Sequence, residues 1–184
     1  VRFHSPRGRS RSLLSRGARA ISPHARNDDA LLVADDASVR IIATNGRTLA
    51  QIATGPNVRD AILTQEWLVV GFENGSLELG TLDPMSVRPN HSFEGTPSSP
   101  VVSLLEGPMN TLIVGFANGI AGLWDLGSGE KLWQDRLHGS VIHLSLNDDL
   151  LVLATDLGDY RVHDLGVFRL EYCELMNQIW SEVP

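Results

Sequence analysis

The feature that most constrains the fold is an internal repeat of about 40 residues. Four segments share the same order of a short apolar stretch, a tight turn and a second short stretch, and their starts lie 37, 44 and 39 residues apart. Two of them also share the pattern Val-Gly-Phe-x-Asn-Gly, at 70–75 and 114–119. Such a period predicts a stack of similar small units rather than one continuous core. The four segments are Ala30–Ile42, Trp67–Leu79, Thr111–Leu126 and Leu150–Leu165.

Each repeat predicts a small antiparallel sheet. In the last three repeats, Asn-Gly or Gly-Asp stands where a tight hairpin needs a positive φ. The strand before each hairpin is apolar at nearly every position, so we expect it to be covered on both faces, as in Leu112–Val114 and Leu151–Leu153. More polar strands follow, such as Glu130–Leu137 and Val141–Leu146. Two buried and two less buried strands in about 40 residues favour a radial stack of four-stranded blades, a β-propeller.

One segment resembles a WD repeat from its first loop to its closing dipeptide. It is residues 137–165, "LHGSVIHLSLNDDLLVLATDLGDYRVHDL". The family repeat runs from a Gly-His pair through hairpin strands to a closing Trp-Asp. Here His138-Gly139 has the inverted order, His163-Asp164 stands in place of Trp-Asp, and Trp124-Asp125 in the preceding repeat matches literally. The resemblance covers roughly Asn27 to Leu165.

The resemblance also implies particular residue roles. In WD repeats a His, a Ser or Thr, an Asp and a Trp form a hydrogen-bonded set inside a blade. His138, Thr155 and Asp156 match three members, with His163 as the candidate fourth. Residues 127–133, "GSGEKLW", resemble an element of quinoprotein-like propellers as well, and that family implies the same architecture.

The predicted fold class is all-β, a partial β-propeller of about four four-stranded blades followed by a short C-terminal α-helix. The blades occupy residues 27–166, and the first repeat takes an outer strand from Gly17–Arg26. Residues 1–26 form a basic Arg- and Ser-rich tail or a degraded blade. Apolar residues at three- and four-residue spacings predict an amphipathic helix over 167–184. The chain does not start with Met, and we expect it to be part of a longer gene product.

The charge is unevenly distributed along the chain. Residues 1–27 contain seven Arg and no acidic residue, whereas all 22 acidic residues lie from Asp28 onward against eight Lys and Arg. Nucleic acid is repelled by such an acidic body, so only the tail could contact RNA or anionic lipid. The alternative is that the tail has no binding role.

The number of predicted blades bears on whether the chain associates with further subunits. An open end of a propeller exposes an apolar blade face, which drives association. We therefore expect further blades from missing sequence or from another subunit, and we expect the isolated chain not to be a simple monomer.

Catalytic chemistry is not indicated. The adjacent carboxylates, such as Asp148-Asp149, stand beside turns, where acidic side chains cap amides. The six His form no metal-ligand spacing, and neither a Gly-x-Ser-x-Gly elbow nor a phosphate loop occurs. Cys173 lies in an apolar context and predicts an inert thiol. We expect no enzyme, no catalytic residues, no cofactor and no metal.

These observations predict a non-enzymatic protein–protein interaction scaffold with an unnamed protein partner. One alternative is a sensor or accessory module of a larger signalling protein, a kinase or NTPase, and another is a quinoprotein-like propeller enzyme. The candidate partner-binding face is Trp67, Phe72 and Phe116, for which core packing is the alternative. No apolar run reaches the roughly 18 residues of a membrane span, and the single Cys excludes an internal disulfide, so we expect a cytoplasmic protein.

Overall fold

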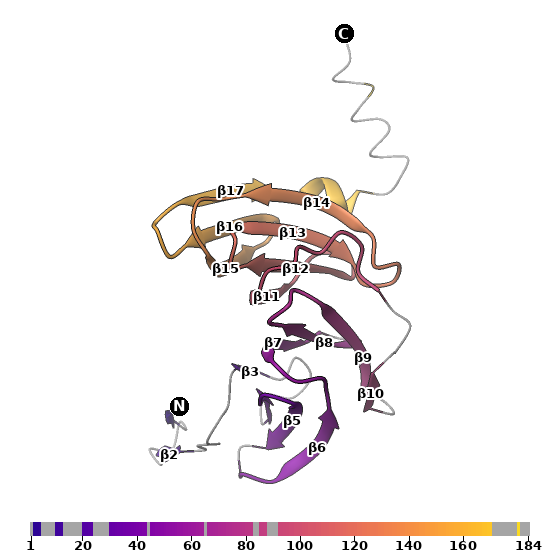
Figure 1. Ribbon diagram of the computed structural model, residues 1–184, viewed down its shortest axis with the longest axis vertical. Helices are drawn as coiled ribbons and strands as arrows, with labels where there is room; N and C mark the ends of the chain where they lie inside the picture. The colour runs from indigo at the N-terminus through magenta and orange to yellow at the C-terminus, as the bar shows by residue number, and fades with distance from the viewer. Residues whose placement is uncertain are drawn as a thin grey trace. The chain divides into compact units, whose positions relative to one another are not determined.

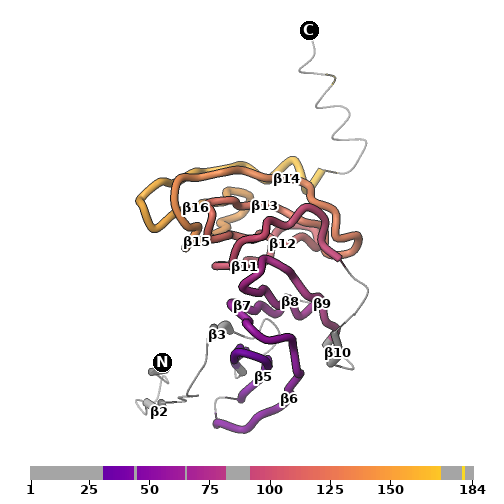
Figure 2. The backbone as a smooth tube through the Cα atoms, viewed as in Figure 1, coloured from indigo at the N-terminus to yellow at the C-terminus, as the bar shows by residue number. Residues whose placement is uncertain are grey.

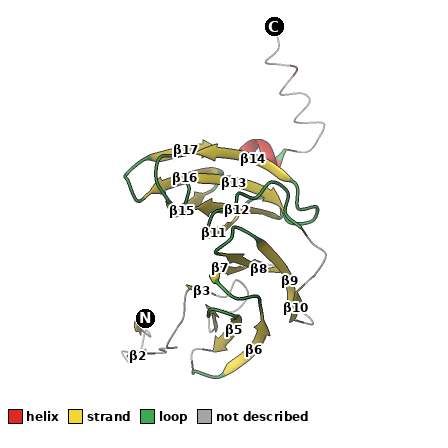
Figure 3. Cartoon of the chain, viewed as in Figure 1, coloured by secondary structure: helices red, strands yellow, loops and turns green. Residues whose placement is uncertain are grey.

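The computed structural model describes residues 2–4, 10–12, 20–23, 30–43, 45–64, 66–82, 85–87, 92–170 and 180. These residues are almost entirely strands and turns (Figures 1 and 3). The strands form three four-stranded sheets, one three-stranded sheet and one two-stranded sheet, and every pairing is antiparallel. The prediction of an all-β fold is confirmed at this level.

The chain divides into two compact units. The first comprises residues 1–73 with 77–91, and the second comprises residues 74–76 with 92–184. Sheets β3-β4-β5-β6 and β7-β8-β9-β10 belong to the first unit, whereas β11-β12-β13-β14 and β15-β16-β17 belong to the second. The first unit has the strands β1 (Arg2–His4), β2 (Ser10–Ser12), β3 (Ala20–Pro23), β4 (Ala30–Ala34), β5 (Ser38–Ala43), β6 (Thr48–Ala53), β7 (Val58–Leu63), β8 (Trp67–Phe72), β9 (Leu77–Leu82) and β10 (Met85–Val87). The second has β11 (Val101–Glu106), β12 (Thr111–Phe116), β13 (Ile120–Asp125), β14 (Lys131–Arg136), β15 (Val141–Asn147), β16 (Leu150–Thr155), β17 (Tyr160–Asp164) and the 3₁₀ helix η1 (Gly166–Arg169).

Each of the four repeat segments forms a hairpin of one sheet, central in the three four-stranded sheets and ending at the edge strand β17 in the three-stranded one. They form the pairs β4-β5, β8-β9, β12-β13 and β16-β17, as the sequence predicts. The glycines of the last three turns have the positive φ that such turns need: +86° at Gly75, +84° at Gly119 and +82° at Gly158. β3 pairs with β4, which confirms that the Gly17–Arg26 region supplies an outer strand to the first sheet.

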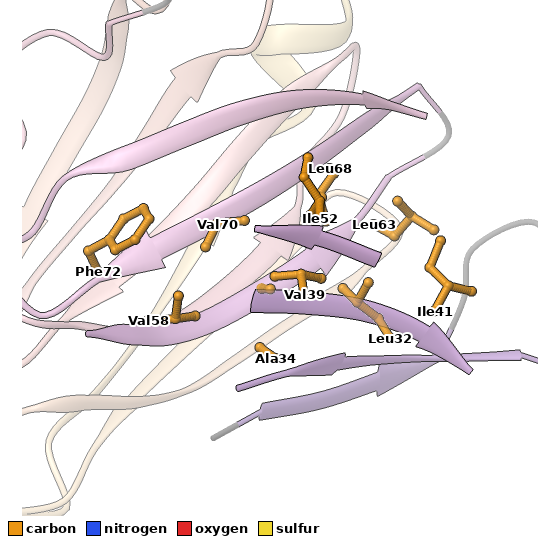
Figure 4. Close-up of a cluster of buried hydrophobic side chains, with 11 residues drawn as sticks. Leu32, Ala34, Val39, Ile41, Ile52, Val58, Leu63, Leu68, Val70 and Phe72 are labelled. Atoms are coloured by element: carbon orange, nitrogen blue, oxygen red, sulfur yellow. The ribbon is translucent and has the colours of Figure 1, made fainter. Parts of the chain in front are cut away.

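The core of the first unit lies between its two four-stranded sheets (Figure 4). Alternate residues of a strand share a face, so Leu32 and Ala34 of β4 point to the same side of their sheet. They pack with Val39 and Ile41 of β5 against the apolar side chains of β7 and β8. The buried members are Leu32, Ala34, Val39, Ile41, Ile52, Val58, Ala61, Leu63, Leu68, Val70 and Phe72.

The second unit repeats this arrangement with its own pair of sheets (Figure 2). Ile113 of β12 and Ala121 and Leu123 of β13 pack against Leu151 and Leu153 of β16. All six residues of β12 are buried, because β12 is covered on both faces as predicted. Leu105, Trp133, Leu144, Leu146 and Phe168 pack around the same cluster.

The last sheet departs from the prediction. We expect Leu151–Leu153 to be covered on both faces, but β16 is buried on one face only: Leu151 and Leu153 are buried, Leu150 is exposed and Val152 is half-buried. The prediction is wrong here because η1 follows β17, and the described part of the chain contains no further sheet after it. This sheet also has three strands, whereas the preceding sheet has four.

The terminal predictions fall mostly outside the described residues. In the tail, β1 and β2 pair with each other; residues 1, 5–9, 13–19 and 24–29 lie outside the description. At the other end, η1 covers the start of the helix expected over 167–184, and from 171 onward the description includes Trp180 alone. Within the described residues, no helix has both the length and the apolar character needed to cross a bilayer.

The turn glycines provide a matched test of sheet-to-sheet packing. A Cβ at Gly119 would overlap the carbonyl oxygens of Leu137 and Gly139, whereas a Cβ at Gly158 would meet nothing within 4 Å. Both residues have nearly the same φ. We therefore expect Gly158→Ala to cost about 1 kcal/mol of unfolding free energy, from backbone strain alone. Gly119→Ala should cost about 3 kcal/mol, because backbone must also move.

Urea unfolding of both variants, followed by circular dichroism, measures this difference. Equal losses of stability in the two variants would show that the loop before β15 does not pack on the β12–β13 turn.

Candidate interaction surface on the last sheet

The literal Trp-Asp pair belongs to the core and to a turn. Trp124 is fully buried, and its Nε1 donates a hydrogen bond to the Glu94 carbonyl oxygen at 2.8 Å. Its ring meets Phe116 edge-on, with 6.0 Å between ring centroids. Asp125 Oδ1 accepts a hydrogen bond from the backbone N–H of Ser128 and so caps the turn after β13. Both residues therefore serve the packing and the turn of their own sheet.

Three residues of the expected WD-type set meet at one end of the last sheet. The Thr155 hydroxyl donates to the His138 carbonyl oxygen at 2.7 Å and accepts from the Asp159 N–H at 3.1 Å. Asp156 Oδ1 accepts from the Ser140 N–H at 2.8 Å, and Asp159 Oδ2 accepts from the His138 N–H. The backbone of His138 therefore makes these contacts, where the resemblance implies its side chain.

His163 lies apart from this group. Its Nε2 is 2.9 Å from Oδ2 of Asp135 in β14, and its ring packs edge-on against Trp133 of the same strand. The four-residue set is thus divided, because position 163 faces the preceding sheet while Thr155 closes the loop at the opposite end of the hairpin. Asp164 and Gly139 also serve local geometry: Asp164 Oδ1 accepts from the Gly166 N–H, and Gly139 has a φ of +99°.

The candidate aromatic face is mostly interior. Phe72 belongs to the core of the first unit and Phe116 is fully buried, which agrees with the alternative of core packing. Trp67 is half-buried at the start of β8, and its backbone N–H donates a hydrogen bond to the Thr64 hydroxyl oxygen at 3.0 Å. The aromatic residues therefore do not form an exposed patch together.

The exposed apolar surface lies instead on the last sheet. Cross-strand partners share a face, and the pairings Val152–Val162 and Ala154–Tyr160 place these side chains on the side away from Leu151 and Leu153. We call this side the outer face. Tyr160 is 68%, Val162 53% and Leu150 49% exposed. The outer face comprises His143, Ser145, Asn147, Leu150, Val152, Ala154, Tyr160, Val162 and Asp164, with Ile142 at a bulge on its edge and Leu157 in the adjoining turn.

The same positions are covered in the sheet before it. Aligning Thr111–Leu126 with Leu150–Leu165 places Ile113, Ala121 and Leu123 at the positions of Val152, Tyr160 and Val162. Those three residues are 0% exposed because the last sheet packs on them. The outer face thus has apolar residues at positions where the fold elsewhere places a sheet-to-sheet contact. Aligning the two repeats indicates that Val152, Tyr160 and Val162 correspond to residues of a packed face. The apolar run Leu151–Leu153 alone does not indicate which face of the strand remains exposed.

Glu78 is a carboxylate with a perturbed pKa that the sequence pattern does not indicate. It lies in β9 opposite Val70, a member of the first unit's core. Desolvation by burial raises the pKa of Glu78 above its ordinary value of 4.5.

Among the described residues, no three His, Cys, Asp or Glu side chains are placed to hold a metal ion.

Comparison with known proteins finds structures of similar fold but no family. No protein-family model matches the chain, and no curated protein matches it. The computationally designed Ika4 protein is similar in structure, with a TM-score of 0.67 and 20% identity over 84% of this chain and 96% of Ika4. The computationally designed Ika8 protein has a TM-score of 0.64 and 19% identity over 79% of this chain and 46% of Ika8. The chain therefore spans about half the length of Ika8, and at these identities the likeness concerns the fold alone.

The Thr155 hydroxyl provides a test of the loop network. Thr155→Val keeps the side-chain shape but leaves the His138 carbonyl and the Asp159 N–H without this partner, so we expect a loss of about 2 kcal/mol in unfolding free energy. Thr155→Ser retains the hydroxyl and should cost less than about 1 kcal/mol. Chemical denaturation measures both values, and a Ser variant as unstable as the Val variant would contradict this role of the hydroxyl.

Glu78 gives a pH-dependent test. Its raised pKa means that the folded state binds the proton more tightly than the unfolded state. Stability from this group is therefore complete below about pH 4.5 and is lost as the pH rises through the raised value. We expect Glu78→Gln to be more stable than the wild type at about pH 7 and equally stable at about pH 4. Thermal unfolding at both pH values, with the exposed Glu66→Gln as control, tests this; a gain that is the same at both pH values would contradict it.

Proposed function

We propose that the chain is a non-enzymatic protein–protein interaction module built from WD-like β-propeller blades, and that the outer face of the last sheet is its binding surface. The observation that carries the proposal is the exposure of Tyr160, Val162 and Leu150 on one sheet face. Single exposed apolar side chains are ordinary on protein surfaces, but a contiguous patch on a strand face indicates an interaction site.

The blade arrangement is supported by the internal similarity of the two units. In each unit one sheet places alternate apolar residues of its central hairpin against the next sheet. The hairpins recur at the repeat spacing, and the turns after β8, β12 and β16 place glycine at nearly equal positive φ. A radial stack of such sheets is the arrangement that a repeat of about 40 residues with four strands favours.

The chemistry of the outer face favours a protein partner. Val141–Leu165, which contains the whole last sheet, has five Asp and one Arg, so it repels the phosphates of nucleic acid. Its centre offers aliphatic side chains and one phenol ring, which suit the apolar side chains of another protein surface. An aromatic residue beside aliphatic ones is also the composition from which dominant binding residues are commonly drawn.

Recovery of partners from an extract of the natural host tests this function. The wild-type chain, Val162→Glu and Leu132→Glu serve as matched baits, because Val162 and Leu132 are both exposed apolar strand residues and Leu132 lies in β14, away from the outer face. A charge at the centre of an apolar interface is costly, so Val162→Glu should lose a partner that Leu132→Glu retains.

Circular dichroism of each bait establishes that it is folded. Equal recovery of every bound protein by all three folded baits would contradict the assignment of the outer face as the binding surface.

A further inference from the structure

We propose that the free edge of β17 pairs antiparallel with β17 of a second copy of this chain, so that two last sheets join across a two-fold axis at Val162. The contact uses the backbone edge of the sheet and leaves the outer face open, so it goes beyond the binding surface proposed above. Both of its sides belong to the second unit. Because the same edge serves both copies, a single contact closes the assembly.

The last sheet lacks the strand that completes each four-stranded sheet. The third strand of those sheets, β5, β9 or β13, pairs with a fourth strand, β6, β10 or β14. β17 is the third strand of its own sheet in the same order, and the described part of the chain provides no strand beyond it. An unpaired strand edge is a template for pairing with another chain.

The two ends of the β16–β17 hairpin show which backbone groups of β17 are already bonded. At one end the Thr155 N–H donates to the Asp159 carbonyl oxygen at 2.9 Å, and at the other the Leu165 N–H donates to the Asp149 carbonyl oxygen at 2.7 Å. Bonded pairs alternate along an antiparallel ladder, so every second residue from Asp159 to Leu165 bonds to β16. The residues between them direct their N–H and C=O groups to the free edge. These residues are Tyr160, Val162 and Asp164.

The corresponding groups of the preceding sheet are bonded. The repeat alignment matches the three free residues of β17 with Ala121, Leu123 and Asp125 of β13. Ala121 and Leu123 pair with β14, and the Asp125 N–H donates to the Glu130 carbonyl oxygen at 3.0 Å. The edge of β17 therefore has the geometry of a strand that receives a fourth strand.

The free groups fit one register of self-pairing. Val162 lies opposite Val162 of the second copy, and Tyr160 lies opposite Asp164 of the second copy. Every N–H and C=O on the free edge then faces a group of the opposite kind. A slip of one residue would set these groups against residues already bonded to β16, and a slip of two would leave an end of the edge unpaired. The pairing also brings the two Val162 side chains together at the centre of a joined outer face.

The charges next to this edge favour a second copy as the partner strand. In the register above, Arg161 of one copy stands beside His163 of the other, as a non-bonded pair whose side chains lie close together. Both side chains point to the side opposite the outer face, where His163 Nε2 lies 2.9 Å from Asp135 Oδ2 in β14. Arg161 is exposed and makes no ion pair within the described part of the chain. Pairing places its guanidinium within reach of the Asp135 carboxylate of the other copy.

Like charges at the ends of the sheet oppose this contact without preventing it. The last sheet and its loops carry five Asp and one Arg over Val141–Leu165. Most of these Asp lie in the turns at the two ends of β16, whereas the paired edge is centred on Val162. At an ionic strength of about 0.15 M, exposed charges are screened beyond about 8 Å, which leaves the short-range pairing dominant. The dimer should therefore strengthen as salt is raised from a low concentration.

Light scattering after size-exclusion chromatography of the full chain measures the mass over a range of concentrations, and we expect it to rise from 20.1 kDa to twice that value. Val162→Pro removes the central N–H of the free edge and should weaken the dimer at least about tenfold, because proline cannot donate to a ladder. A dimer that a folded Val162→Pro chain forms as readily as the wild type overturns the edge contact.

Gln134→Pro in β14 is the matched control for this variant. The Leu137 N–H donates to the Gly119 carbonyl oxygen, and from this bonded pair the alternation along the ladder directs the Gln134 N–H away from β13. Both substitutions thus remove an N–H that points away from its own sheet. Gln134→Pro should leave the dimer within about twofold of the wild type, because β14 is not part of the contact.

Amide hydrogen exchange resolved by residue distinguishes edge pairing from contact through the outer face. The N–H groups of Arg161 and His163 are bonded to β16 in the single chain, so their exchange should change little with concentration. Those of Tyr160, Val162 and Asp164 should exchange at least about tenfold more slowly in the dimer. Complete protection of these three groups in a monomeric chain would show that another segment covers the edge, and it would overturn the second copy as the occupant.

Charge variants test the choice of partner strand. Arg161→Glu places a carboxylate beside Asp135 of the other copy and should weaken the dimer at least about tenfold. Arg161→Lys keeps the charge and should change the dissociation constant by less than about threefold. Circular dichroism establishes that each variant is folded. A folded Arg161→Glu chain that dimerises like the wild type contradicts this register.

The outcomes separate this inference from the proposed function. A wild-type chain that keeps a mass of 20.1 kDa at every concentration overturns the dimer, and recovery of host proteins other than the chain itself still decides the role of the outer face. A dimer that is lost in Val162→Pro supports edge pairing. If host proteins are then recovered equally by the wild type, Val162→Glu and Leu132→Glu, the dimer stands and the proposed function fails.

Discussion

The packing of one sheet's apolar face on the next sheet is the interaction on which the rest of this structure depends. A sheet of three or four short strands cannot bury both of its faces by itself. All six residues of β12 are buried, and on one of its faces the last sheet supplies the contact through Leu151 and Leu153. The positive φ at Gly119 belongs to the same contact, since the turn must approach the backbone of the loop leading into β15. Tyr160 and Val162 are exposed because, within the part of the chain that the structure describes, no further sheet packs on the last one.

The polar residues of the repeats serve this packing. Thr155, Asp156 and Asp159 hold the loop at His138 and Ser140, from which β15 starts. Trp124 fixes the segment before β11 through the Glu94 carbonyl, and Asp125 closes the turn that follows β13. Each contact satisfies a backbone group at the end of a strand, where the ladder provides no partner. These polar contacts fix the position of a sheet edge, whereas apolar side chains make the contacts between sheets.

Much of the fold could be predicted from the sequence because a repeat places the same physical constraint on each copy. The hairpins, the glycine turns and the strand from Gly17–Arg26 follow from local patterns, and the structure confirms them. The burial of β16 could not be predicted, because the apolar run Leu151–Leu153 is similar in sequence to Leu112–Val114. Whether one or both faces of such a strand are buried depends on the presence of a following sheet, which the run itself does not show. The position of His163 beside Asp135 depends in the same way on a strand of another sheet.

The central claim is that the outer face of the last sheet is a contact surface of the same kind as those inside each unit. Amide hydrogen exchange of the wild-type chain tests it most directly when it is measured with and without a protein that the wild-type and Leu132→Glu baits retain and the Val162→Glu bait loses. β13 is the internal reference, because its face is already covered by the last sheet. The account predicts that exchange in β17 slows in the bound state, while exchange in β13 is unchanged. Exchange in β17 that is equally fast with and without the bound protein would contradict it.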